Sequence, residues 1–482
     1  MNDTTFSLAA ILPAMPEIYL TGAICVLLLF DVFFALKRPE RTATFALLLL
    51  LGGAAITMAT HEFGVRQVLF DSMYIADDLG MLLKLASFLF VAVALFYSND
   101  YLARRKLQQG EYYVLTLTAL LGILVLTSAG NLLSVYVGIE LLSLSLYALV
   151  AFDRDNGIAA EAAMKYFVLG AIASGTLLYG MSLIYGLSGS LSLQVISHAF
   201  SGEPSLGLIL GLAMVVVAIA FKFGAVPFHM WVPDVYQGAP TSVTLLVASA
   251  PKIASFAVAY RLLAEGLGDA TALWTQMLAI LAVLSLVAGN IIAIAQTNLR
   301  RMLAYSAISN VGFILLGFVT GTSAGYQASL YFTIVYVMVV LGTFGVILLS
   351  ARDGYEADEL DDYKGLAARD PSLAFIMAVF MFSTAGIPPF VGFWAKLRVI
   401  EALIGAGHIW LSGVAVVMSV IGAFYYLRVV WLMYFDAPGD RPRGEPRLSL
   451  RFVVGVNAAA ALALGLMPDA LLDVCLKVVR PG

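Results

Sequence analysis

The chain has 482 residues, of which 61% are hydrophobic and 12% are charged, and its mean hydropathy is +0.94. The charged share is about half that of a typical soluble domain, so the chain cannot fold as a water-soluble globule. The net charge of −4 is small and argues against a nucleic-acid partner.

Fourteen apolar segments follow one another along the chain, and a membrane span needs about 20 such residues. They cover residues 16–36, 42–60, 78–98, 112–130, 131–152, 162–186, 206–237, 241–263, 271–296, 302–320, 326–350, 372–402, 409–434 and 452–473. Segments 206–237 and 372–402 are longer than a straight span requires and contain internal prolines, so we expect each to be a broken helix. The sequence therefore predicts an all-α, polytopic membrane protein of about 14 transmembrane helices.

Lysine and arginine collect in alternate connections between these segments. Of the 27 such residues, 15 lie in connections on one side and four on the other. The 15 are Lys37, Arg38, Arg41, Arg104, Arg105, Lys106, Arg154, Arg300, Arg301, Arg352, Lys364, Arg369, Arg441, Arg443 and Arg447, and the four are Arg66, Arg261, Lys477 and Arg480. Since basic connections stay in the cytoplasm, we expect both termini on the outer side of the membrane. No basic residue opens the chain, so no signal peptide is evident.

Four charged residues, Glu140, Lys222, Lys252 and Lys396, fall deep within the predicted spans. A charge that faces lipid at mid-membrane costs roughly 2.5–3.5 kcal/mol on insertion scales, so these side chains should face protein or water. Lys252 directly follows Pro251, whose ring leaves a helix carbonyl unpaired, and we expect that carbonyl to lie near the ammonium.

Buried lysines can carry protons because burial favours their neutral form and a nearby carboxylate favours their charged form. A lysine whose carboxylate partner approaches or withdraws would change its proton affinity. The alternative is that these residues form structural ion pairs between helices, and Glu140 and Lys222 are the pair to which this applies best. Lysines 252 and 396 have no spare intramembrane acid in the sequence.

Other polar residues in the spans have weaker interpretations. Lys165 forms an i,i+4 pair with Glu161 at the start of its span and could also deliver protons inward. His229 lies in the break of segment 206–237, where it is either a satisfied core residue or a relay. Four charges lie toward span ends, where snorkelling is common, and we interpret them as structural; these are Asp31, Lys84, Arg398 and Arg428.

The two over-long segments share a local pattern. One reads GAVPF at 224–228 and the other GIPPF at 386–390, and a tryptophan follows each. Interrupted helices in two halves of a chain indicate a transport site between inverted repeats, although both could be plain proline kinks. We expect N-terminal helices in residues 1–111, five-helix repeats in 112–264 and 265–435, and a final helix in 436–482.

Redox and nucleotide motifs are missing from the sequence. The pairs Gly266/Gly268 and Gly405/Gly407 lack the third glycine of a dinucleotide fingerprint. The two cysteines stand apart and the four histidines are scattered, which excludes iron–sulfur and zinc-finger patterns. We therefore expect no metal or cofactor in this chain.

Residues 221–252, FKFGAVPFHMWVPDVYQGAPTSVTLLVASAPK, resemble the signature of the antiporter-like membrane subunits of respiratory complex I. That family is similar to the Mrp cation/proton antiporters and to membrane-bound hydrogenase subunits. Four more stretches fit it: YVGIELLSLSLYAL (136–149), EAAMKYFVLGA (161–171), LRRMLAYSAISNVGF (299–313) and STAGIPPFVGFWAKL (383–397). Asn310 departs from the pattern because relatives often have histidine there, which weakens any histidine relay in that helix.

The resemblance implies a fold and a set of roles. The fold has 14 helices, two inverted five-helix repeats, and breaks in helices 7 and 12. The implied proton path uses Glu140, Lys222, Lys252 and Lys396. Of the family's three subunit types, one has a long lateral helix after the bundle and one has glutamate where this chain has Lys396, so the chain fits the third type.

These considerations predict a proton-pumping subunit of an NADH:quinone oxidoreductase. NADH, FMN, iron–sulfur clusters and quinone would then belong to partner subunits. We expect contacts with membrane lipid, with the antiporter-like M subunit and with the small K and J subunits. The alternatives are a subunit of a sodium/proton antiporter or of a membrane-bound hydrogenase, and a passive membrane scaffold.

Overall fold

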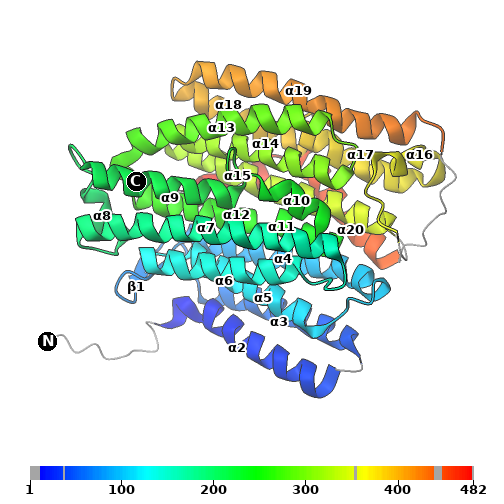
Figure 1. The fold of residues 1–482 in the computed structure, drawn as a ribbon, viewed down its shortest axis with the longest axis horizontal. Coiled ribbons are helices and arrows are strands. Elements are labelled where there is room, and N and C mark those ends of the chain that lie inside the picture. The colour runs from blue at the N-terminus through cyan, green and yellow to red at the C-terminus, as the bar shows by residue number, and fades with distance from the viewer. Residues whose placement is uncertain (1–10, 36–37, 352–354, 439–447, 480–482) are drawn as a thin grey trace.

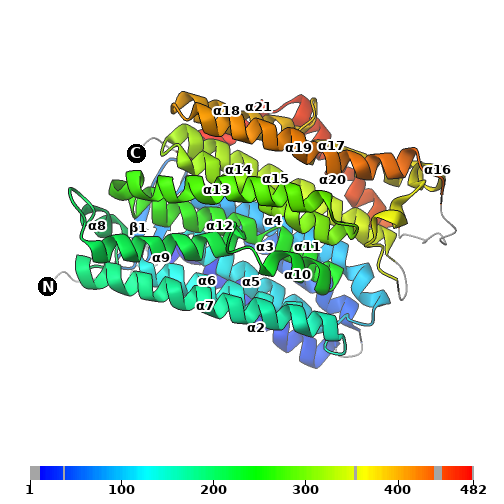
Figure 2. The same ribbon diagram turned by 45° about the horizontal axis from the view of Figure 1, so that its top comes forward.

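Long helices lie side by side in the computed structural model, which describes residues 11–35, 38–351, 355–438 and 448–479 (Figure 1). The N-terminal helices form one edge of this assembly, and the helices near residue 400 form the opposite edge (Figure 2). The chain is nearly all helical, as predicted, with one two-stranded antiparallel hairpin.

The first part of the chain contains the hairpin and the helices up to the first break. Its elements are η1 (Leu12–Ala14), α2 (Met15–Phe30), η2 (Asp31–Ala35), α3 (Pro39–Thr60), β1 (Gln67–Leu69), β2 (Tyr74–Ala76), α4 (Asp78–Arg104), α5 (Gly110–Thr127), α6 (Leu132–Val150), α7 (Gly157–Ser188), α8 (Leu193–His198) and α9 (Leu206–Phe223). Side-chain caps begin several of these helices; Asp77 accepts from Gly80 N at 2.8 Å and Asn131 from Ser134 N at 2.8 Å.

The second part begins after the break in residues 224–230. Its elements are α10 (Trp231–Gly238), α11 (Thr241–Ala248), α12 (Pro251–Ala259), the π-helical turn η3 (Tyr260–Glu265), η4 (Gly268–Ala270), α13 (Thr271–Ile294), α14 (Leu299–Val319), α15 (Ser323–Ser350), η5 (Leu360–Tyr363), α16 (Leu366–Arg369), α17 (Pro371–Ala385), α18 (Val391–Gly405), α19 (Ile409–Tyr434), α20 (Leu448–Leu466) and α21 (Asp469–Val478).

The predicted spans agree with the helices. Thirteen helices or runs of helix among the described residues are long and apolar enough to cross a membrane. The remaining predicted segment, 372–402, is the shorter pair α17 and α18. Both predicted breaks are confirmed: each falls after a glycine in the left-handed region, Gly224 at φ +78° and Gly386 at φ +82°, a conformation that side chains with a Cβ rarely adopt.

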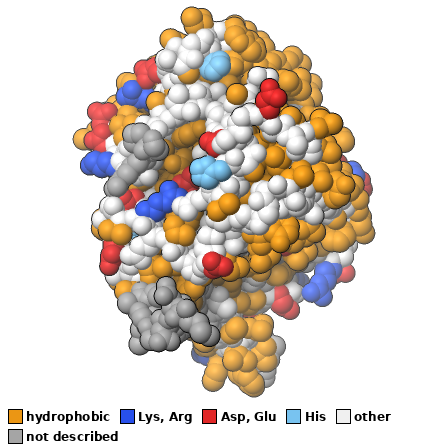
Figure 3. All heavy atoms as spheres, turned by 90° about the vertical axis from the view of Figure 1, so that its left-hand side faces the viewer, with side chains coloured by type: hydrophobic (Ala, Val, Ile, Leu, Met, Phe, Trp, Pro, Cys, Tyr) orange, Lys and Arg blue, Asp and Glu red, His pale blue; other side chains and the backbone are white. Residues whose placement is uncertain are grey.

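The core of the assembly lies along α11, α12, α14 and α15, whose side chains are almost entirely buried. Helices α2, α7, α19 and α20 expose much of their apolar surface. The exposed end that carries the hairpin shows charged and histidine side chains among polar surface, with hydrophobic side chains gathered along its flank (Figure 3). This distribution is what a lipid-embedded bundle requires. The basic residues Lys37, Arg352, Arg441, Arg443, Arg447 and Arg480 lie outside the described residues.

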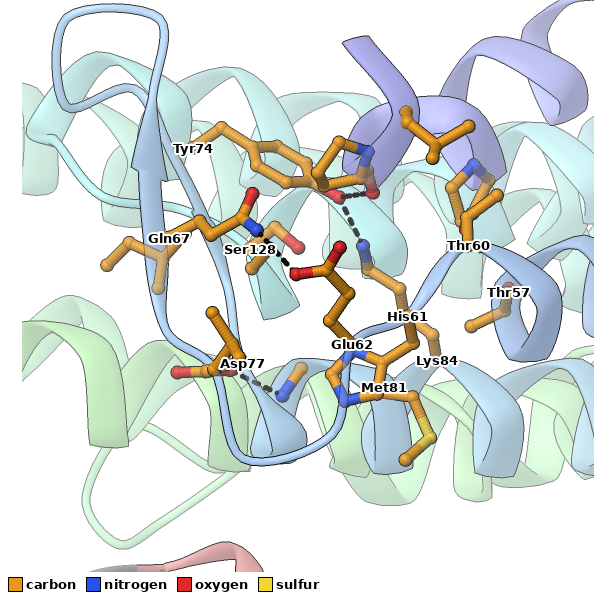
Figure 4. Close-up of a pocket in the computed structure, with 17 residues that line it drawn as sticks. Thr57, Thr60, His61, Glu62, Gln67, Tyr74, Asp77, Met81, Lys84 and Ser128 are labelled. Carbon is orange, nitrogen blue, oxygen red and sulfur yellow. Dashed lines mark hydrogen bonds between the residues drawn. The ribbon is translucent and has the colours of Figure 1, made fainter. Parts of the chain in front are cut away.

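Lys84 has a structural role, as interpreted from the sequence, although it is held inside the bundle and does not snorkel to the interface. Its side chain is only 5% exposed, and its Nζ lies 2.6 Å from Glu17 Oε1 and 2.7 Å from Tyr74 Oη. The Tyr74 hydroxyl in turn donates to Pro13 O at 2.6 Å. Burial raises the pKa of Tyr74, so the hydroxyl stays neutral. These contacts fasten α2 to α4 beside a cavity of about 60 Å³ (Figure 4).

We expect Lys84→Met to lower the free energy of unfolding by about 3–5 kcal/mol, because it leaves the Glu17 carboxylate buried without its partner. The double variant Lys84→Met/Glu17→Leu should recover most of this loss, since a well-packed apolar pair has no desolvation penalty. Thermal unfolding of the purified protein in detergent measures both. Equal losses in the single and double variants would contradict this account.

Candidate functional site

The carboxyl end of α9 is the centre of the candidate site. Because the helix stops at Gly224 inside the membrane region, its last carbonyls have no partners within the helix. Trp231 Nε1 donates to Phe221 O at 3.1 Å, and Ser255 Oγ donates to Lys222 O at 3.3 Å. Side chains from α10 and α12 therefore satisfy a helix end that water cannot reach.

Lys252 caps the last carbonyl of that helix end. Its Nζ donates to Phe223 O at 2.7 Å, and the residue is 2% exposed. The expectation that the ammonium would meet a carbonyl freed by Pro251 is therefore wrong. The chain does break before Pro251, between α11 and α12, but the negative end of the α9 dipole is the stronger attraction for a cation.

Glu140 and Lys222 face each other across α6 and α9 through hydroxyl groups. Ser174 Oγ on α7 donates to Glu140 Oε1, and Lys222 Nζ donates to Ser143 Oγ, one turn along α6 from the glutamate. The Glu140 carboxylate lies close enough to act electrostatically on Lys222. The two charges thus interact without the direct contact of a structural ion pair.

Lys396 repeats the arrangement of Lys252 at the second break. Its Nζ donates to Ala385 O at 2.9 Å, the last carbonyl of α17, and to Ser419 Oγ on α19 at 3.0 Å. The ring of Phe313 lies 5.4 Å from the same nitrogen, a favourable cation–π distance. The residue is 8% exposed. Both of its hydrogen-bond partners are uncharged groups.

A polar chain lies beside Lys396. A cavity of about 20 Å³, enough for one water molecule, is lined by Lys396, Asn310 and Tyr336. From Asn310 the chain continues through Tyr426: Asn310 Nδ2 lies 3.4 Å from Tyr426 Oη, which lies 3.1 Å from Tyr425 Oη.

The chain continues from Tyr425 toward the end of α13. The Tyr425 hydroxyl donates to Asn290 Oδ1 at 3.0 Å. Ser306 Oγ lies 2.5 Å from Tyr426 Oη and adds a second contact. Sequence reasoning named Asn310 but missed the two tyrosines. A tandem of tyrosines within an apolar helix is the signal that could have indicated them.

The hydrogen bonds of Lys222, Lys252 and Lys396 do not involve the two possible relay residues, Lys165 and His229. Lys165 is exposed and pairs with Asp234 at 2.8 Å and with Glu161 at 2.9 Å. Asp234 also binds Arg301 at 2.9 Å, so Lys165 belongs to an ion-pair network at one end of the bundle. His229 is half-buried in the break, and its Nδ1 has no hydrogen-bond partner among the described residues. Within the described ranges, no group of three or more His, Cys, Asp or Glu side chains is placed to hold a metal ion.

The sequence matches a known protein family over most of its length. Residues 129–422 match the family described as NADH:quinone oxidoreductase/Mrp antiporter, TM. NADH-quinone oxidoreductase subunit N from Thioalkalivibrio sulfidiphilus is 50% identical over 472 residues, which are 97% of this chain and 98% of that protein.

Solved structures give the same fold. A chain of respiratory complex I from Thermus thermophilus with bound aureothin has a TM-score of 0.81 and 31% identity, covering 95% of this chain and 99% of that one. A chain of the Mrp complex from Dietzia sp. has a TM-score of 0.85 and 23% identity, covering 98% and 97%. At 23% identity, the similarity to the Mrp complex chain shows a shared fold and nothing more.

Gly386 offers a test of the second break. An added Cβ would lie 2.8 Å from Lys396 Cδ, and φ of +82° is strained for any residue with a Cβ. We expect Gly386→Ala to lower stability by at least about 1–2 kcal/mol, the ordinary cost of that backbone region. The matched control is Gly413→Ala, because that helical glycine has open space around its Cβ direction and alanine should leave stability equal or higher. Thermal unfolding in detergent compares the two; equal midpoints would contradict the proposed constraint.

Proposed function

Since the chain belongs to the NADH:quinone oxidoreductase/Mrp antiporter family of transmembrane subunits, we propose how its buried residues carry protons. It is a proton-translocating membrane subunit of NADH:quinone oxidoreductase, within the bacterial inner membrane, and it carries out no redox step itself. NADH, FMN, the iron–sulfur clusters and quinone then belong to partner subunits, and the M, K and J subunits are the neighbours we propose.

The observation that carries the proposal is the pairing of lysine ammoniums with broken helix ends. Lys252 lies on Phe223 O and Lys396 on Ala385 O, each buried and each without a carboxylate as its hydrogen-bond partner. The helix dipole stabilises the charged lysine while burial destabilises it. A small shift of the helix end therefore changes proton affinity, which is what a pump requires.

We assign Glu140 and Lys222 to the control of Lys252. Lys222 is the residue before Phe223, whose carbonyl Lys252 binds from α12. Both lysines therefore lie at the last turn of α9. When Glu140 approaches Lys222, it offsets that positive charge and Lys252 can keep its proton. When Glu140 withdraws, the two cations repel and Lys252 releases its proton.

Lys396 is the carrier that we place toward the outer side. The basic connections put the end of α13 at Ile294 in the cytoplasm, and the tyrosine chain leads from Asn290 near that end to the Lys396 cavity. This chain can reload Lys396 from the cytoplasm. Lys396 also fits the third subunit type of the family, and the similar proteins are named subunit N.

The wider organisation is also a proposal. We propose five-helix repeats in residues 112–264 and 265–435, each with one broken helix, flanked by residues 1–111 and 436–482. Lys165 could deliver protons from its exposed network, and His229 could serve at the break. The 50% identity to a subunit N favours complex I over a sodium/proton antiporter.

We expect Lys252→Ala to lower NADH-driven acidification of inverted membrane vesicles by at least about tenfold, because loss of a proton-transfer group commonly costs 10²–10⁴-fold. Lys252→Arg should fail as well, since arginine keeps the charge but does not release its proton. The exposed Lys364→Ala is the matched control.

Assembly of the complex and NADH oxidation by an artificial acceptor must stay normal in these variants. Full pumping by Lys252→Ala in an assembled complex would show that the lysine is structural. Full pumping by Lys252→Arg would show that only its charge matters.

Orientation can be tested by adding one cysteine at a time to a Cys25→Ser background, in which the remaining native cysteine, Cys475, is buried. Glu203 and Asp155 are both exposed, in connections at opposite ends of the bundle. A membrane-impermeant maleimide should label Glu203→Cys in spheroplasts and Asp155→Cys only in inverted vesicles. The reverse pattern would overturn the proposed orientation.

A further inference from the structure

A large cavity opens at the end of the bundle that carries the hairpin. Its volume is about 580 Å³. Its walls come from the α3–β1 and β2–α4 connections, α8, η3, α15 and α21. Apolar groups form much of the lining, and its charged and polar side chains include Arg66, Asp77, Asp78, Gln194, Glu265 and Ser323. The lysine and arginine bias places this end outside the cell, so we name the cavity the outer vestibule. Figure 3 views the molecule from this end.

Two tyrosines, Tyr260 and Tyr326, line the vestibule, and two phenylalanines complete a closed set with them. The Tyr260 and Tyr326 rings lie 5.7 Å apart, and Tyr326 lies 5.5 Å from Phe318. Phe318 lies 5.5 Å from Phe256, which lies 6.1 Å from Tyr260. Each ring therefore contacts two others, and we name these four residues the aromatic gate.

The aromatic gate lies on the line between the vestibule and Lys252. Lys252, Phe256 and Tyr260 occur at positions i, i+4 and i+8 and so share one face of the same helical run. The rise from Lys252 to Tyr260 is about 12 Å. Phe256 is fully buried and Tyr260 is 8% exposed. One face of this helix thus carries the buried ammonium, an apolar ring, and then the rim of a polar cavity.

We propose that Lys252 has its own outlet to the outer vestibule and that the aromatic gate closes it. The inference rests on the proposed function, because it takes Lys252 as a proton carrier. Closely packed aromatic rings exclude the water that a proton needs, so the gate is closed as the structure has it. When the rings part, the Lys252 ammonium gives its proton to a water molecule, leaving a neutral amine and a hydronium ion that passes into the vestibule.

Two features next to the aromatic gate support this proposal: a π-helical turn and a fixed arginine. The helix changes from α to π at Tyr260, and π-helical turns inside α-helices are frequent at functional sites. Beyond the gate, Arg261 is fixed: its guanidinium donates twice to Asp77 at 2.7 Å and to Thr127 O at 2.9 Å. We therefore expect the rings of the aromatic gate, and not Arg261, to move when the gate opens. Arg261 also pairs with Glu265 at 3.0 Å, so the same guanidinium holds two carboxylates of the vestibule wall.

The test is the number of protons pumped per NADH oxidised by the assembled complex in proteoliposomes. We expect Phe256→Ala and Phe318→Ala to lower this ratio several-fold while the NADH:quinone rate stays near that of the unaltered protein, since protons return through an outlet that no longer closes. Tyr260→Phe keeps the ring and should keep the ratio. Phe88→Ala, an equally buried ring between α3 and α4, is the matched control and should also keep it.

The outcomes separate clearly. An unchanged ratio in both alanine variants overturns the gate, and so does an equal loss in Phe88→Ala, which would mean general loosening. If an alanine variant fails to assemble, Phe256→Leu and Phe318→Leu replace it with smaller expected losses in the same direction. Failure of the proposed function is distinct, because Lys252→Ala would then leave both rate and ratio unchanged.

Discussion

The structure depends on one constraint: inside a membrane, a backbone carbonyl that loses its helical partner must find another donor. Helices α9 and α17 stop within the bundle, before Gly224 and Gly386, and in both cases a lysine ammonium binds the last carbonyl. The cation is thus part of the backbone's own hydrogen bonding. Release of its proton weakens that bond, so proton transfer and the position of the helix end are physically linked.

The free carbonyls at the two helix breaks are bound in different ways. At the first, Lys252 comes from a neighbouring helix, and Trp231 and Ser255 share the task of capping. At the second, Lys396 follows the break on the same chain segment and also binds Ser419. The first ammonium therefore responds to movement between two helices. The second responds to rearrangement within one broken helix, and its contact with a small cavity gives it access to water.

The spans, both breaks and the four buried charges could be predicted because they depend on local properties: apolar length, proline and glycine, and charge within an apolar run. What the sequence could not supply were partners across helices. Lys84 lies near a span end, where snorkelling is common, yet Glu17 on another helix holds it inside. The carbonyl that Lys252 binds is 29 residues away rather than the one next to Pro251. Packing between helices decides such pairings, and residue periodicity does not encode it.

Hydrogen bonds and ion pairs of charged side chains hold the segment around Lys252 at both of its ends. At one end of the segment around Lys252, Arg261 binds Asp77; at the other, Thr241 Oγ1 donates to Glu356 Oε2 at 2.8 Å and Arg300 Nη1 binds Ala239 O at 2.9 Å. Between these fixed ends, the Lys252 ammonium donates a hydrogen bond to the Phe223 carbonyl. Directional contacts of charged groups resist displacement more than the contacts of rings and aliphatic side chains do. The segment around Lys252 is therefore held more firmly at its two ends than in its middle.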